Sequence, residues 1–548
     1  MKRTKLYLMA AVAAALFTPK AEGCTNLIAG KKASADGSVM VTYAADSHNL
    51  YGMLTHTPAA RHEPGAMRKV VEWDTNKPLG EIPQPAETYN VVGNINEHQV
   101  AIGESTWGGR KELADTTGQA VIDYGSLIQI ALERSRTARE AVQLMGDLVN
   151  QYGYASEGES FSIADKNEVW VMEMIGKGAE KGAVWIAVRI PDDAISGHAN
   201  EPRIRKVNLK DKKNVLHSKD VVSFARKRGY FNGKDEDFSF ADAYGEHDAA
   251  TRRGCDARVW SYFRRFAPAT DKYYDWCAGK SDEPMPLYVV PEKKVSLKEM
   301  QQSMRDHFEG TPFDMTQDVG AGPNKVPYRW RPMEYEVDGK KYCMERAIAT
   351  QQTGWSFVTQ SRDWLPDPVG GVIWFGTDDT NTSVYMPFYC GMTEVPAELA
   401  HGDINTFDMN SNFWMTNWVA NQAYNRYDLM IPDIRKVQGA LEGKFRETRP
   451  ERDKELAGYV EAGNLDAYRN RVNEEGKRIA KASTDAYRSL AQYLFVKFMD
   501  GNMKKTDDKG NFIKSEYDLP VYPTFPGYDK KYYENIVKET GDHFLLPE

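Results

Sequence analysis

The sequence predicts an α+β protein in which antiparallel sheets are covered by helices. Three observations support this prediction: β-rich runs flank turn residues in pairs, a helical stretch follows the second pair, and the region from about 409 to 500 is strongly helical. The order is strands, helices and then more strands. A parallel sheet would instead call for strands that alternate regularly with helices.

Hairpins are expected in the first hundred residues, because two pairs of β-rich runs each surround a short polar turn. They are residues 25–45, turning at the favoured pair Asp36-Gly37, and residues 88–104, turning near Asn96-Glu97. The first predicted strand begins directly after Cys24, so that residue would lie at the tip of a sheet strand.

Residues 125–151 are expected to be helical, with a capping box from Thr137 to Glu140 followed by an apolar stripe. The stripe consists of Ala141, Val142, Met145, Leu148 and Val149. The chain then returns to strand over residues 160–175. The runs 183–190 and 194–199 are expected to continue the same sheet.

The second half of the chain repeats the mixture of elements. Helices are expected near 218–228 and 254–266, strands over 345–390, and helices over most of 409–500. We therefore expect three parts, namely a leader over 1–23, a catalytic core with insertions over 24–400, and a mostly helical region over 401–548 that packs on the core.

The composition is that of an ordinary globular chain, with 41% hydrophobic and 27% charged residues. Its 548 residues allow two or three domains, or one large core with elaborations. The chain carries 70 basic and 78 acidic residues, and removal of the leader would leave 66 and 77. This mildly acidic balance argues against nucleic acid as a partner. No stretch after the leader is long and apolar enough to predict a transmembrane segment.

The first 23 residues have the pattern of a secretory signal peptide. A basic start precedes residues 6–17, an apolar run of 12 residues that is too short to span a bilayer. Ala21 and Gly23 place small residues at positions −3 and −1 of a cleavage point. The sequence therefore predicts cleavage after Gly23 and export to the periplasm or the medium.

Cleavage there would make Cys24 the first residue of the mature chain, with a thiol and a free α-amine on one residue. The amine could then serve as the base for its own nucleophile. Two other interpretations stay open at this point. Cys24 could be a lipid anchor, although Ala21 and Glu22 fit the usual pattern before a lipidated cysteine poorly. It could also be an ordinary paired or buried cysteine.

The other four cysteines form no CxxC motif, which makes a zinc or thioredoxin-like site a weak interpretation. They are Cys255, Cys277, Cys343 and Cys390. Two disulfides and four buried free thiols remain equally open in an exported protein. The sequence also contains no HExxH, GxSxG or P-loop pattern, which disfavours elbow-type serine hydrolases and nucleotide enzymes.

Four stretches resemble the cysteine-type dipeptidases of the N-terminal-nucleophile superfamily, the family of bacterial dipeptidase A, with the secernins as relatives. They are CTNLIAGKKASADGSVMV, TAREAVQLMGDLVNQYGYASEGESFSIADKNEVWVMEMIGKG, ISGHANEPRIR and SRDWLPDPVGGVIWFGTDDTNTSVYMPFYCGMTEVP. The resemblance covers most of the mature chain. It implies a four-layer αββα sandwich, an N-terminal cysteine nucleophile and hydrolysis of dipeptides. Bile salt hydrolases and penicillin V acylases are more distant members of the superfamily.

The resemblance implies that the Cys24 thiolate attacks the scissile carbonyl, while its α-amine accepts the proton and returns it to the leaving amine. Asp46 matches an Asp that lies near the nucleophile in the acylases, and is expected to orient the α-amine. The alternative is a turn residue that caps Asn49 or its neighbours. Tyr43 stands where the acylases have Arg, so that guanidinium is not supplied here.

Four further residues take expected roles from the same resemblance. Asn200 matches an oxyanion-site Asn, an effect of roughly 3–4 kcal/mol in comparable enzymes, or is a loop residue with local backbone bonds. Arg258 matches an Arg near the cysteine and would lower the thiol pKa or bind the substrate carboxylate, unless it belongs to a solvated basic helix face. Glu104 and Ser105 match the second oxyanion segment, and Glu104 could instead bind the substrate's ammonium.

The predicted function is that of an exported cysteine dipeptidase, a thiol protease that cleaves dipeptides with a free amino terminus. The closest alternative is an amidase of the same superfamily that acts on N-acyl substrates, and the second is a Cys24-lipidated surface protein without catalysis. No cofactor or metal is predicted, because the neighbouring acids Asp378 and Asp379 are more typical of solvated or capping residues. Dipeptides are the expected partners, and a homo-oligomer is compatible with the sequence.

Overall fold

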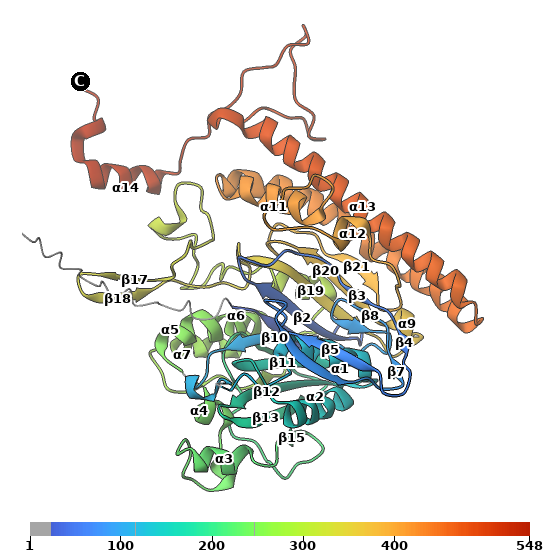
Figure 1. Ribbon diagram of the computed structural model, residues 1–548. Coiled ribbons are helices and arrows are strands. Elements are labelled where there is room, and N and C mark those ends of the chain that lie inside the picture. The colour runs from blue at the N-terminus through green and yellow to red at the C-terminus, as the bar shows by residue number, and fades with distance from the viewer. Residues whose placement is uncertain (1–22, 116, 246, 548) are drawn as a thin grey trace, which may run out of the picture.

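The computed structural model describes residues 23–115, 117–245 and 247–547, so the predicted leader lies outside it except for Gly23. Most of the described strands belong to two large sheets whose neighbours pair in antiparallel fashion, and helices lie on either side of them (Figure 1). The predicted combination of antiparallel sheets with helices, including a helical region toward the C-terminus, is therefore confirmed.

The first sheet contains the strand that follows Cys24. Among the described residues its order is β16 (Tyr288–Val289), β14 (Ile195–His198), β1 (Asn26–Ala29), β2 (Val39–Asp46), β19 (Thr353–Ser361), β20 (Val372–Thr377) and β21 (Met386–Tyr389). Because β1 lies between β14 and β2, the residue just before it is held at the end of a central strand and not at an edge.

The second sheet carries the other side of the site. In the described part of the chain its order is β15 (Val215–His217), β13 (Glu180–Ile190), β12 (Val169–Lys177), β11 (Gly158–Ala164), β10 (Ala101–Trp107), β9 (Ile95–Asn96), β8 (Val91–Val92) and β3 (His56–Thr57). Apolar side chains of both sheets, such as Leu27, Val41, Val171 and Ile186, share one buried core. The two sheets therefore pack on each other through their inner faces.

Two details of the predicted strands are wrong. The hairpin over 25–45 exists, but β1 and β2 are joined by residues 30–38 and not by the two-residue turn Asp36-Gly37. The loop is longer because Ser34 bridges to Val295 and its hydroxyl, like that of Ser38, donates to the Asp36 carboxylate. The run 194–199 does not continue the second sheet. Its strand β14 pairs with β1 in the first sheet.

Helices α1 (Tyr124–Arg134) and α2 (Ala138–Tyr152) cover the outer face of the second sheet (Figure 1). The predicted apolar stripe of α2 is buried against that sheet, as an amphipathic surface helix requires. Thr137 caps α2 by accepting the Glu140 N–H, but the Glu140 carboxylate accepts the N–H of Arg136, so the predicted capping box forms only in part.

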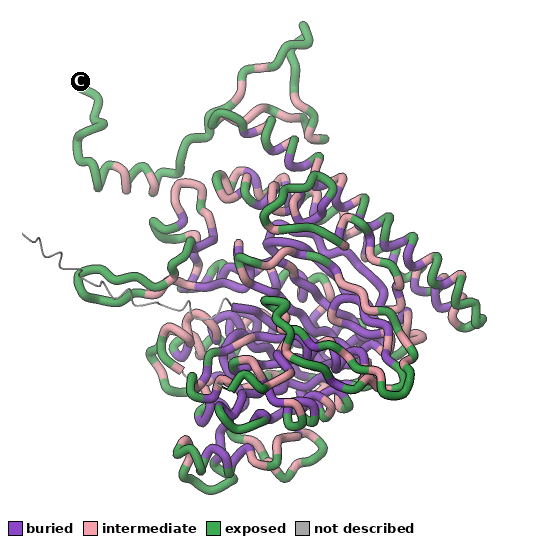
Figure 2. The backbone as a smooth tube through the Cα atoms, in the orientation of Figure 1, coloured by how far each residue is buried: buried purple, intermediate pink, exposed green. Residues whose placement is uncertain are grey.

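Helices α11 (Asn412–Ala423), α12 (Tyr427–Glu461) and α13 (Leu465–Phe498) lie over the first sheet, beyond β21 (Figure 1). The chain after α13, which includes α14 (Lys530–Thr540), extends away from these helices and is largely exposed (Figure 2). The hairpin β17 (Glu334–Val337) and β18 (Lys340–Cys343) also projects from the body and is exposed along β17 (Figures 1 and 2).

The two predicted helices of the middle region are present as α3 (Val221–Lys227) and α6 (Ala257–Phe266). A π-helical turn, Arg252–Asp256, leads directly into α6, and the first turn of α6 lies against the start of β1 through Arg258. All five cysteines of the chain are free thiols. In the described residues no helix combines the length and apolar character needed to cross a membrane.

Candidate active site

Cys24 is buried where the two sheets meet, with 8% of its surface exposed. Its position is fixed because Thr25 exchanges backbone hydrogen bonds with Ala44 of β2. The Cys24 Sγ atom lies 3.5 Å from Oε1 of Glu104 on β10 and 3.8 Å from the Tyr43 hydroxyl on β2. Both sheets therefore contribute a polar group to the thiol.

The surroundings of the thiol favour its neutral form. Burial and the nearby Glu104 and Asp46 carboxylates raise the pKa of Cys24, and the contacts of the sulfur with the Asp46 backbone and with the Tyr43 hydroxyl oppose this shift only in part. Tyr43 also donates a hydrogen bond to Glu104. A nucleophilic reaction of this thiol would accordingly need a base that accepts its proton.

Two arginines surround the peptide bond between Gly23 and Cys24. Nη1 of Arg258 lies 3.1 Å from the Gly23 carbonyl oxygen and 2.7 Å from that of Cys24, and Nη2 of Arg346 also donates to the Gly23 carbonyl. Gly23 fits tightly, since an added Cβ would lie 2.5 Å from Oδ1 of Asn200. Positively charged side chains therefore surround the backbone of Cys24, while a carboxyl group, that of Glu104, lies beside its thiol.

Asp46 is placed beside this peptide bond through a shared partner. Nη2 of Arg346 donates both to the Gly23 carbonyl and to Oδ2 of Asp46, and the Thr353 hydroxyl donates to Oδ1 over 2.6 Å. Burial raises the pKa of Asp46 to about 6, although Arg346 and Thr353 oppose the shift. The carboxylate pairs with a buried guanidinium, so the alternative of a turn residue that caps Asn49 does not describe it.

Arg258 lies on α6 with 1% of its surface exposed, so it is not part of a solvated basic face. Burial and the neighbouring Arg346 lower its pKa to about 10, which leaves it charged at neutral pH. Beyond the two carbonyls described above, its donors reach the Thr25 hydroxyl and Oδ1 of Asn200. While Gly23 is present, the described hydrogen bonds of the Arg258 guanidinium therefore all go to other residues of the protein.

Asn200 follows β14 in the left-handed region, with φ +57°, a conformation that Asn tolerates better than most residues. Its Oδ1 accepts from Arg258 at 2.9 Å, and its Nδ2 donates to the Thr106 carbonyl. The amide donor expected at an oxyanion is thus engaged by β10. These partners are far apart in the sequence, so the residue is not a loop Asn with local bonds.

Ser105 is not brought to the thiol. Its hydroxyl lies 2.6 Å from Nδ1 of His198, whose other ring nitrogen lies 2.7 Å from the Ser162 hydroxyl. Alternation along β10 explains this placement, because consecutive side chains of a strand point to opposite faces. Burial lowers the pKa of His198 to about 3, so this ring stays neutral.

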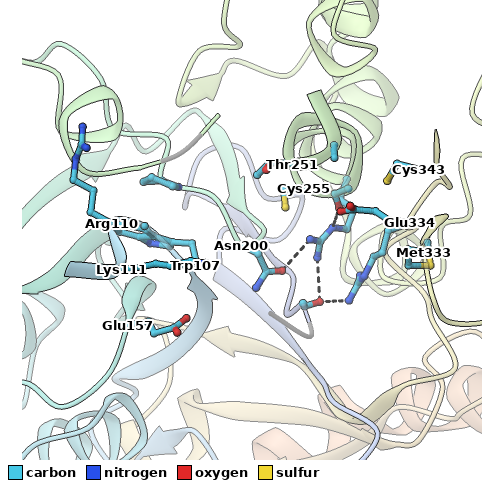
Figure 3. A pocket seen from close by; sticks show the side chains of 18 of the residues that line it. Trp107, Arg110, Lys111, Glu157, Asn200, Thr251, Cys255, Met333, Glu334 and Cys343 are labelled. Atoms are coloured by element: carbon cyan, nitrogen blue, oxygen red, sulfur yellow. Dashed lines mark hydrogen bonds between the residues drawn. The ribbon is translucent and has the colours of Figure 1, made fainter. Parts of the chain in front are cut away.

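A cavity of about 620 Å³ reaches the site from the Gly23 side. In Figure 3, Trp107, Arg110, Lys111 and Glu157 line one wall and Met333, Glu334 and Cys343 the opposite wall, with Asn200 between them. The β17–β18 hairpin thus supplies part of the entrance. Neither Cys24 nor Glu104 lines the cavity, which ends at Gly23, Asn200, Arg258 and Arg346.

Two site residues were missed from the sequence. Arg346 supplies the guanidinium that the Tyr43 position lacks, but it lies in an insertion without a motif, 300 residues from its partner Asp46. Glu159 on β11 is a fully buried carboxyl beside Glu104. All seven residues of β11 are buried, and Glu159 shares its face of the strand with Phe161 and Ile163, which is the sequence signal that could have marked it as a buried acid.

The acids Asp378 and Asp379 are buried and not solvated, which corrects one half of the expectation, whereas the Asp379 carboxylate does cap the turn by accepting the Asn381 N–H. The hydroxyls of Tyr328 and Tyr424 donate to Asp379, and Nδ2 of Asn417 donates to Asp378. Within the described ranges no group of three or more His, Cys, Asp or Glu side chains is arranged to hold a metal ion.

The chain is similar to several curated dipeptidases. The chain is 28% identical over 394 residues to a probable dipeptidase of Salmonella dublin, which covers 68% of this chain and 82% of that protein. It is 24% identical over 499 residues to probable dipeptidase B of Lactococcus lactis, covering 88% and 96%. It is 23% identical over 445 residues to dipeptidase A of Lactobacillus helveticus, covering 77% and 85%.

The model of peptidase family C69 matches residues 23–440, which begins one residue before Cys24 and includes both sheets. A match over about three quarters of the chain leaves little of the two-sheet structure outside it. The chain is therefore a peptidase that belongs to peptidase family C69.

Proposed function

We propose that this protein is an exported dipeptidase in which Cys24, freed by removal of residues 1–23, is the nucleophile. The observation that carries the proposal is the division of charge around Cys24, with Glu104 at its thiol and Arg258 and Arg346 at its backbone end. The dipeptidase names of the relatives support the same substrate class.

In the proposed reaction the Cys24 thiol attacks the scissile carbonyl carbon, and its sulfur–carbon bond forms as the carbonyl becomes an oxyanion. Because the thiol pKa is raised, a base must take its proton, and the Cys24 α-amine fits this role at neutral pH. Asp46 would orient that amine as its ammonium form develops. The proton then passes to the leaving amine, and water releases the acyl group from sulfur.

The oxyanion would be stabilised by the Asn200 amide. Departure of Gly23 opens space beside this side chain, because Gly23 lies against it in the described chain. The Asn200 Nδ2 donor would then exchange the Thr106 carbonyl for the oxyanion, a contact worth roughly 3–4 kcal/mol in comparable enzymes.

The two charges of an unblocked dipeptide match the two charged ends of the site. We assign the ammonium to Glu104, because this carboxyl lies beside the thiol. We assign the carboxylate to Arg258, because this buried guanidinium lies at the end of the cavity, beside the place that Gly23 would vacate. Burial of either substrate charge without a partner would be costly, so both contacts select for free dipeptides. An amidase site would instead need an apolar pocket and no acid at the amine end.

We further propose that the two sheets and their outer helices form the four-layer αββα sandwich of N-terminal-nucleophile hydrolases. Cys24 at the start of a central strand and the packing of the sheets through a shared core support this assignment. Residues 24–400 would form the catalytic core, and 401–548 a helical region packed on it.

The experiment compares three proteins on matched substrates. The mature chain beginning at Cys24, the chain with one extra glycine before Cys24, and Cys24→Ala are assayed on unblocked dipeptides and on their N-acetylated forms. N-terminal sequencing and intact mass of the exported protein establish the first residue and exclude lipidation. We expect turnover only for the mature chain, and at least a hundredfold preference for unblocked dipeptides.

Full activity of the glycine-extended chain would contradict the role of the α-amine. Rapid cleavage of N-acyl substrates, with none of free dipeptides, would favour the amidase. A blocked, lipid-modified N-terminus on the exported protein would overturn the proposed base, since the amine would no longer be basic.

A further inference from the structure

A second buried carboxyl group, that of Glu159, lies beside Glu104, the acid at the thiol. Glu159 on β11 lies diagonally across from Glu104 on β10, because Thr106 is its direct partner in the sheet. The side chain of Glu159 is fully buried, and its carboxyl lies within hydrogen-bonding contact of the Glu104 carboxyl. Among the described residues no donor lies at full hydrogen-bonding distance and geometry from either Glu159 oxygen or from Oε2 of Glu104. The neighbouring Thr106 hydroxyl is a neutral donor that lowers the pKa of Glu159, but burial and Glu104 raise this pKa well above its usual range.

The titratable groups that face this pair are acids, phenols and the thiol. Asp74 from the loop after β5 (Met67–Val71), Tyr124 from α1 and Tyr154 after α2 act on the pair, as do Tyr43 and Cys24 from the first sheet. No lysine, arginine or histidine of the described chain forms an ion pair with Glu104, Glu159 or Asp74. Several other buried acids have such a partner, namely Asp46 with Arg346, Glu442 with Arg305 and Asp453 with Arg362.

Two touching carboxyls in a buried site cannot both be ionised, because their like charges repel in a medium that screens poorly. One proton is therefore held between them. A proton on Glu159 that is donated to Glu104 gives a partner to oxygens that otherwise have none at full hydrogen-bonding geometry. Glu104 then keeps one negative charge, and its Oε1 is the oxygen that faces the thiol.

We propose that Glu159 is a positioning residue of the ammonium site: its carboxyl retains a proton against Glu104, so that the pair presents one negative charge beside Cys24 and binds one α-ammonium group. This inference rests on the proposed dipeptidase function. It adds a residue that touches neither substrate nor thiol and acts through Glu104. The substrate's α-ammonium supplies a cation that no lysine, arginine or histidine of the described residues provides to this pair.

Two substitutions of Glu159 test whether a hydrogen-bond donor at this position, and not a carboxyl group as such, supports Glu104. Glu159→Gln keeps a donor toward Glu104, and Glu159→Ala removes it. For unblocked dipeptides we expect Glu159→Gln to retain KM within about threefold, and Glu159→Ala to raise KM at least tenfold with a smaller effect on kcat. The acid limb of the kcat/KM profile should move to higher pH in Glu159→Ala and return in Glu159→Gln, since an undonated Glu104 ionises less readily.

A matched control is Glu173→Gln on the neighbouring strand β12. Glu173 is also fully buried, but its carboxylate accepts the backbone N–H groups of Arg203 and Ile204, away from the thiol. This variant should lower stability without changing KM or the acid limb. Equal loss of activity in folded Glu159→Gln and Glu159→Ala, or unchanged kinetics in both, would overturn the positioning role.

The shared proton is also measured without turnover. Infrared difference spectra of wild type minus Glu159→Gln at neutral pH should show the carbonyl stretch of a protonated carboxyl. Absence of that band would overturn the inference even in a fully active dipeptidase. If the band is present but the protein cleaves no dipeptide, the shared proton between Glu159 and Glu104 is retained. The proposed dipeptidase function, and with it the binding of a substrate ammonium by this pair, would then be refuted.

Discussion

Replacement of Arg346 by methionine should destabilise the mature protein at pH 8 and much less at pH 5. Arg346 and Asp46 form a buried pair with side chains 8% and 0% exposed. Methionine keeps much of the arginine's apolar bulk but leaves the Asp46 carboxylate without its guanidinium. Removal of one partner from such a pair typically costs about 3–5 kcal/mol.

The pH dependence follows from the pKa of Asp46, which is about 6 with Arg346 present. Loss of the guanidinium raises this pKa further in the folded chain. Below pH 6 both folded proteins hold Asp46 protonated, so they differ little in this respect. Above pH 6 the difference grows by about 1.4 kcal/mol per pH unit until the variant's own pKa is reached. At pH 8 this gives about 3 kcal/mol, near the lower end of the range for a broken buried pair.

The assay is guanidinium-induced unfolding at pH 5 and pH 8, followed by tryptophan fluorescence, for wild type, Arg346→Met, Asp46→Asn and the double variant. The double variant should be more stable at pH 8 than Arg346→Met alone, because it no longer buries an unpaired acid. Equal losses at pH 5 and pH 8, or additive effects of the two substitutions, would refute the reasoning.

Three further predictions concern activity. Cys24→Ala should abolish turnover in a folded protein, and Cys24→Ser should keep a small fraction of the wild-type turnover. Cys255→Ala should mainly change the thermal midpoint of unfolding, and a folded but inactive Cys255→Ala protein would contradict the assignment of Cys24 as the nucleophile. Asp46→Asn should lower kcat/KM at neutral pH and remove the part of the acid limb that lies near pH 6, as a pH–rate profile would show, and an unchanged limb would exclude Asp46 as its source. Glu104→Gln should narrow the preference for unblocked over N-acetylated dipeptides, mainly by weakening the unblocked substrate; a preserved ratio in paired kcat/KM measurements would move the ammonium site elsewhere.

Local patterns predicted the elements of this fold better than their connections. The apolar stripe of α2 and the return to strand over residues 160–175 are readable because their partners lie nearby in the sequence. The strand β14 has an equally clear β pattern, but nothing local states that it pairs with β1 and not with β13. The long β1–β2 loop depends on Val295, which is equally remote.

The site shows the same limit in a sharper form. Cys24, Asp46, Asn200 and Arg258 carry family resemblance, and the structure does bring them together. Arg346 lies between an exposed hairpin and β19 without a motif around it, and only the folded chain connects it with Asp46. Ser105 lies away from the thiol for a simpler reason: consecutive side chains of β10 point to opposite faces, and its neighbour Glu104 is the one that contacts the thiol.

The close fit of Gly23 has a consequence for how this sequence can change over time. The final residue of a leader is ordinarily judged by the export machinery alone, which accepts several small side chains. In the described structure Gly23 also lies against Asn200 and Arg258, and a Cβ added to it would come within 2.5 Å of Oδ1 of Asn200, so one of these side chains would have to shift. If cleavage follows Gly23, an alanine at this position would remain a good secretion signal and yet strain the folded precursor. The end of the leader and the residues around Cys24 would then have to change together, and the leader of another protein could replace this one only if it also ended in glycine.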